Sequence, residues 1–140
     1  MKKETKKQLL IGAALVLELL LLLLYLNGRI DKLLDSDMSS EMILGQLLAR
    51  NNGILSDQWY YSTELRVLNT QLIYALFFRL SSNWHFVRMA STLVLWCVLI
   101  ASYGVLCRVM GCKKSFGVTA LLLAAPVSES YFRFVLAGVY

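Results

Sequence analysis

The stretch LLIGAALVLELLLLLLYL, residues Leu9–Leu26, decides the fold of this chain. It is 18 residues long and contains one charged side chain, Glu18. A helix of that length rises about 1.5 Å per residue and nearly crosses a hydrocarbon core of roughly 30 Å. A signal peptide would also follow basic residues, but its apolar region is usually only about 7–15 residues long. No small-x-small cleavage site follows Leu26 either, so we expect a retained membrane span over residues 9–26.

The composition agrees with a membrane protein. Of the 140 residues, 58% are hydrophobic, and the mean hydropathy is +0.60, which is more apolar than an ordinary soluble domain. The net charge of +5 does not indicate nucleic-acid binding, because the basic residues flank the apolar runs, where they anchor membrane helices. We therefore expect a single all-α domain in the cell membrane that contacts membrane lipids and no nucleic acid.

The basic residues also predict the orientation. Four lysines in the tail at residues 1–8 place the N-terminus in the cytoplasm. A second apolar run, Met89–Cys107, gives a second span over residues 86–107, and it ends at the basic loop 108–115. Residues 27–85 then form a long first extracytoplasmic loop. The three cysteines lie outside that loop, so it has no disulfide framework.

The last part of the chain, residues 116–140, leaves two alternatives open. Either one long third span carries polar residues in the middle of the membrane, or a short third span leaves it near Glu129 and a fourth begins at Tyr131. No polar tail closes the C-terminus. The sequence therefore predicts three or four spans in a multi-pass protein, and a fragment of a longer chain.

Two amphipathic helices are expected in the long loop. Asp37 would cap a helix over Met38–Arg50, with residues 51–53 as its stop. Ser62 or Thr63 would cap a second helix over Glu64–Leu80. The second helix is too polar to span a membrane alone, so both are expected at the membrane surface.

Two acids, Asp35 and Asp37, directly follow the first span. In an extended segment, residues i and i+2 project to one side, so these carboxylates can share a divalent metal such as Mg²⁺ or Mn²⁺. A carboxylate there can take the proton from an acceptor hydroxyl that attacks a sugar. A metal would hold the phosphate leaving group. The competing interpretation is structural, with Asp37 as a helix cap and Asp35 as a solvated charge.

This layout resembles the N-terminal part of the GT-C membrane glycosyltransferases, such as the protein O-mannosyltransferases and the lipid A aminoarabinose transferases. The string WYYSTELRVLNTQL, residues Trp59–Leu72, is also similar to one in uncharacterised bacterial multi-span proteins. The resemblance implies transfer of a sugar from a polyprenyl-phosphate donor to an extracytoplasmic acceptor. It implies that Asp35 or Asp37 is the catalytic base or metal ligand. A second loop acid often helps in this family, and Glu129 is in that position if the third span ends before it.

Glu64 and Arg66 are further candidates for substrate binding. Arg66 could bind a donor phosphate with two parallel hydrogen bonds, although a charge pair on a helix surface is the alternative. GT-C enzymes have many more spans, so we do not expect this chain to be active alone. The alternative function is a small non-enzymatic membrane protein that packs against a partner through the small residues Gly12, Ala13 and Ala14.

Overall fold

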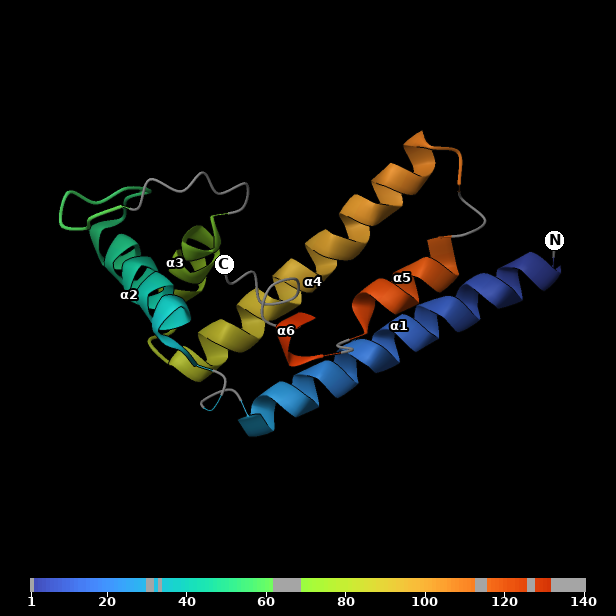
Figure 1. The fold of residues 1–140 in the computed structure, drawn as a ribbon, viewed down its shortest axis with the longest axis horizontal. Coiled ribbons are helices and arrows are strands. Elements are labelled where there is room, and N and C mark those ends of the chain that lie inside the picture. The colour runs from blue at the N-terminus through green and yellow to red at the C-terminus, as the bar shows by residue number, and fades with distance from the viewer. Residues whose placement is uncertain are drawn as a thin grey trace.

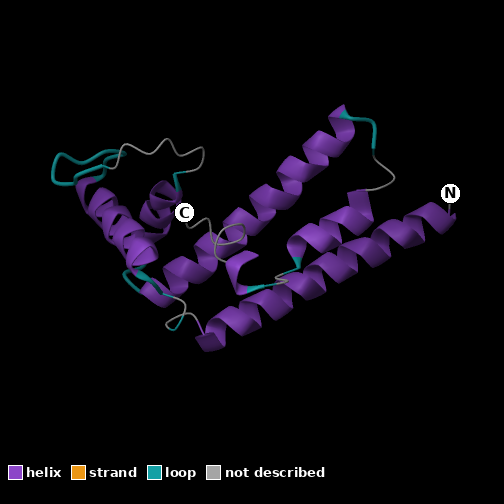
Figure 2. Ribbon diagram, in the orientation of Figure 1, coloured by secondary structure: helices purple, strands orange, loops and turns teal. Residues whose placement is uncertain are grey.

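The structure, a computed structural model, describes residues 2–29, 32, 34–61, 69–112, 116–125 and 128–131. All regular secondary structure in these residues is helical (Figure 2). The helices in chain order are α1 (Lys2–Arg29), α2 (Ser36–Asn51), α3 (Thr70–Phe78), α4 (Trp84–Val109), α5 (Phe116–Ala124) and α6 (Glu129–Tyr131). The predicted all-α class is confirmed for this part of the chain.

Helices α1 and α4 are long and apolar enough to cross a membrane. The qualifying segments are Thr5–Arg29, with 25 residues, and Trp84–Val109, with 26 residues. Of the α1 side chains that the structure describes, only Leu22 and Leu26 are buried, and large leucines along the rest of the helix are exposed. Lipid tails cover such a surface readily, whereas water does not. The two expected spans, residues 9–26 and 86–107, each lie within one of these helices.

The short helix α5 lies between α1 and α4 and packs against both (Figure 1). Its Gly117 sits so close to Ile11 of α1 that an added methyl group would collide with that side chain. The N-terminal end of α1 and the C-terminal end of α4 lie at one end of the molecule, and α2 and α3 lie at the other (Figure 1). The basic N-terminal end of α1 and the basic C-terminal end of α4 therefore lie on the same side of the molecule.

Helix α2 begins two residues earlier than its sequence predicts. Its N-cap is Asp35, not Asp37, and Asp37 lies in the first turn. Asp35 has an extended backbone conformation, and its carboxylate accepts a hydrogen bond from the backbone N–H of Met38. Asp35 therefore satisfies an N–H that has no partner within the helix. At the other end, Asn52 ends the helix with a φ of 50° in the left-handed region, in agreement with the predicted stop.

Helix α3 begins at Thr70, so the predicted continuous helix over Glu64–Leu80 is wrong. Residues 62–68 lie outside the described part of the chain, but Asn69 is not helical and precedes the first turn. Its side-chain carbonyl accepts a hydrogen bond from the Gln71 amide at 3.2 Å. Asparagine favours such local contacts over a helix interior. The helix also ends at Phe78, two residues before Leu80.

The region after α5 turns back on itself. The chain leaves the helix at Ala125 and is helical again in α6. The Tyr131 hydroxyl donates a hydrogen bond to the Leu123 carbonyl oxygen at 2.6 Å, and its ring packs on a cluster of buried residues from α1, α2, α4 and α5. The nine residues of α5 rise about 14 Å, roughly half of a hydrocarbon core. Most of the predicted third and fourth spans falls outside the described residues.

Candidate functional site

The first loop acid, Asp35, has a structural task. One carboxylate oxygen accepts the Met38 N–H at 2.9 Å, and its backbone carbonyl accepts the Ser39 hydroxyl at 2.6 Å. The side chain is half-buried. These contacts fix the first turn of α2, in which Asp37 lies.

The second loop acid, Asp37, faces solvent. It lies in the first turn of α2 and is exposed, with the Ser36 hydroxyl 3.5 Å from one carboxylate oxygen. The N-terminus of a helix carries partial positive charge, which favours a charged carboxylate at this position. Asp37 is therefore the acid of the pair that a substrate could reach from outside.

A third acid, Glu41, also lies at this end of the molecule and was not predicted as a site residue from the sequence. It lies one turn after Asp37, yet its side chain is only 6% exposed. The Thr70 hydroxyl donates a hydrogen bond to its carboxylate, and Thr70 itself is 1% exposed. The signal was present in the sequence, because Glu41 falls on the same helical face as Met38 and Met42. An acid within an apolar face is expected to be buried with a partner.

A buried cation lies at the same junction. Arg88, near the start of α4, is 6% exposed. Burial raises the pKa of Tyr74, and the positive charge of Arg88 opposes part of that rise in pKa. Tyr74 packs with Met42, Phe78 and Val87, so α2, α3 and α4 meet here. The end of the molecule that holds Asp37 thus contains a carboxyl group, Glu41, and a cation, Arg88, that are both buried.

The other predicted site residues are not brought to this junction by any described contact. Glu64 and Arg66 lie outside the described residues. Glu129 begins α6, but its side chain is not part of what the structure describes. The Nε2 atom of His85 lies 3.0 Å from the Asn27 side-chain oxygen. That contact joins the end of α1 to the start of α4.

The predicted metal site is incomplete in the described part of the chain. Asp35 lies before the helix and Asp37 within it, and one oxygen of Asp35 is already used as a cap. No three His, Cys, Asp or Glu side chains are grouped for a metal ion among the residues that the structure describes. Because Mg²⁺ and Mn²⁺ favour several oxygen ligands, Asp35 and Asp37 would need further ligands to hold one.

Comparisons with known proteins add no assignment. No protein-family model, no curated protein and no solved structure matches this chain. The regular structure of the described residues is helical, and two of these helices are long and apolar enough to cross a membrane.

Proposed function

We propose that this chain is the N-terminal part of a membrane glycosyltransferase of the GT-C type. It would transfer a sugar from a polyprenyl-phosphate donor to an acceptor outside the cytoplasm. The observation that carries the proposal is the position of Asp37. It is an exposed carboxylate in the first turn of α2, in the connection between two helices able to cross a membrane.

The proposed orientation puts this acid at the outer face. The basic residues in the first turns of α1 and at the end of α4 are the positive-inside signal, and both lie at the end of the molecule away from α2 and α3 (Figure 1). A polyprenyl phosphate carries its headgroup at the membrane surface. Asp37 would then meet the donor at the depth of its sugar. In this proposal residues 116–140 contribute a third span and part of a fourth.

In the proposed reaction Asp37 is the base. Its carboxylate takes the proton from the acceptor hydroxyl while that oxygen attacks the anomeric carbon of the donor sugar. The bond from the anomeric carbon to the phosphate oxygen breaks, and polyprenyl phosphate leaves with the electron pair. Asp35 does not touch the substrate. It positions Asp37 by capping the helix in which Asp37 lies.

The experiment is a sugar-transfer assay on the full-length membrane protein. We expect Asp37→Asn to lower the rate by about 10²–10⁴-fold, the usual effect of losing a positioned base. Asp35→Asn should have a much smaller effect, since asparagine also caps helices well. Asp57→Asn is the matched control, because Asp57 is exposed in the loop after α2. Transfer that survives Asp37→Asn at the unmodified rate rejects the proposal.

A second candidate function is helix packing with a membrane partner. The observation in its favour is on α1, where an added methyl group on Gly12 would meet no atom within 4 Å in the described part of the chain. Ala13 beside it is exposed, so another helix could approach this surface closely. Gly12→Leu should then abolish co-purification of a partner, while Gly28→Leu, at the far end of the same helix, should not. A chain that co-purifies with no partner would remove this alternative.

A further inference from the structure

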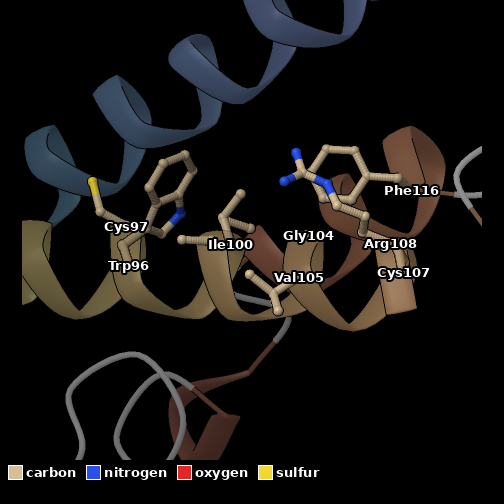
Figure 3. Close-up of a pocket in the computed structure, with 9 residues that line it drawn as sticks. Trp96, Cys97, Ile100, Gly104, Val105, Cys107, Arg108 and Phe116 are labelled. Atoms are coloured by element: carbon tan, nitrogen blue, oxygen red, sulfur yellow. The ribbon is translucent and has the colours of Figure 1, made fainter. Parts of the chain in front are cut away.

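An open groove runs along the C-terminal half of α4 and ends at the first residue of α5 (Figure 3). Its volume is about 610 Å³, and its wall is almost entirely apolar. The small residues Ala101 and Gly104 leave room on the α4 side, and Trp96 and Phe116 stand at its two ends. Tyr103 stacks on the Phe116 ring with centroids 5.9 Å apart, which fixes that end of the wall.

The charged group in this groove is Arg108. Figure 3 shows its side chain reaching back along α4, with the guanidinium beside the Phe116 ring. The direction follows from helix geometry, because side chains lean toward the N-terminus of their helix. The guanidinium is therefore carried toward the apolar part of the groove and away from the basic end of the helix.

No acidic residue lies near Arg108 in the sequence. The sequence from Met89 to Ser128 contains no Asp or Glu, while it contains Arg108, Lys113 and Lys114. Among the residues that the structure describes, no carboxylate contacts the Arg108 guanidinium. Arg108 is exposed, so its guanidinium is accessible to an anionic group of another molecule, with which it can form charge-assisted hydrogen bonds.

We propose that the groove binds one anionic phospholipid, with its phosphate on Arg108 and an acyl chain along Ala101 and Gly104. An acyl chain matches the apolar walls, and the lipid phosphate supplies the negative charge. Basic pockets between membrane helices on the cytoplasmic side are a known setting for anionic headgroups. A second helix would fill the groove equally well but would have to supply its own acid. The proposal rests on membrane insertion and does not depend on sugar transfer.

The experiment measures quenching of Trp96 fluorescence by lipids with brominated acyl chains. The chain carries Trp59→Phe and Trp84→Phe so that Trp96 alone reports, and it is reconstituted with brominated phosphatidylglycerol or phosphatidylcholine of the same acyl composition. We expect the anionic lipid to quench at about tenfold lower mole fraction, the effect of one charge-assisted hydrogen bond. Arg108→Gln should remove that preference, and Ala101→Phe should reduce quenching by both lipids.

Arg79→Gln is the matched control, because Arg79 is an exposed arginine at the opposite end of the molecule, after α3. It should leave the lipid preference unchanged, and circular dichroism should show equal helix content in every variant. Equal quenching by the two lipids overturns the proposal, as does a preference that survives Arg108→Gln. Protection of Trp96 from both lipids in a dimer would assign the groove to a second copy and also overturn it. None of these results depends on transferase activity.

Discussion

The buried carboxylate of Glu41 accepts a hydrogen bond from the Thr70 hydroxyl across 29 positions of sequence. The substitution Thr70→Val keeps the shape of the side chain but removes the hydroxyl that donates to this buried carboxyl group. We expect the free energy of unfolding to fall by about 1–3 kcal/mol, the cost of losing such a partner. Thr70→Ser keeps the hydroxyl and should lose less. Detergent-solubilised protein unfolded by denaturant and followed by its helical signal gives both values, and equal losses would contradict the role of the hydroxyl.

Tyr74, in the same junction, makes stability depend on alkaline pH. Burial raises its pKa in the folded protein, and the Arg88 cation offsets only part of that rise in pKa. The unfolded chain therefore releases the tyrosine proton first, near the ordinary pKa of about 10. Stability is complete below that pH and is lost as the pH rises through the folded pKa. Tyr74→Phe should remove this loss, so the two unfolding profiles should differ in slope above about pH 10. Equal slopes for the original chain and Tyr74→Phe would mean that Tyr74 does not cause the loss of stability.

The sequence predicted part of this junction, and its failures have physical causes. The sequence pointed to both acids after the first span, but Asp37 was predicted as the cap of α2. Either aspartate could accept a hydrogen bond from a backbone N–H of the first helical turn, so the sequence alone did not distinguish them. Asp35 is the cap in the structure, and the side chain of Met38, three residues later, is fully buried. The contact between Glu41 and Thr70 could not be read from local patterns, because it depends on how α2 packs against α3.

At the scale of elements, α2 and α3 pack tightly at Gly45. A methyl group there would lie 2.6 Å from Tyr74 Cβ and 3.0 Å from the Gln71 carbonyl oxygen, and neither atom is at the end of a flexible side chain. We expect Gly45→Ala to lower the free energy of unfolding by about 1–3 kcal/mol, despite the better helix propensity of alanine. Gly12→Ala in α1 meets no described atom within 4 Å and should be neutral or slightly stabilising. A Gly45→Ala variant as stable as Gly12→Ala would mean that the two helices do not pack this tightly.

The helices that depend on local sequence patterns were predicted, whereas the features that depend on packing between helices were not. Helices α1 and α4 were predicted because a long apolar run has one stable form in lipid. The predicted start of α3 was too early, because Leu65 and Leu68 continue the helical spacing of apolar residues in the sequence. In the structure Asn69 is not helical, and α3 begins after it, at Thr70. The acyl-sized groove beside α4 could not be predicted at all. It requires Phe116 of α5 to lie over Gly104, a contact that the spacing of residues does not reveal.

At the scale of the whole molecule, the orientation in the membrane can be tested at two exposed sites. Cys112 follows the basic end of α4, and Asp57 lies in the loop after α2 at the other end. In a chain with Cys97→Ala and Cys107→Ala, we expect a membrane-impermeant maleimide to label Cys112 only after the cells are opened. With Cys112→Ser and Asp57→Cys added, the same reagent should label intact cells. The reason is that basic ends stay in the cytoplasm. Labelling of both sites in intact cells, or of neither, would mean that α1 and α4 do not separate these two ends across the membrane. The exposed leucines of α1 would then need a protein partner to cover them instead of lipid.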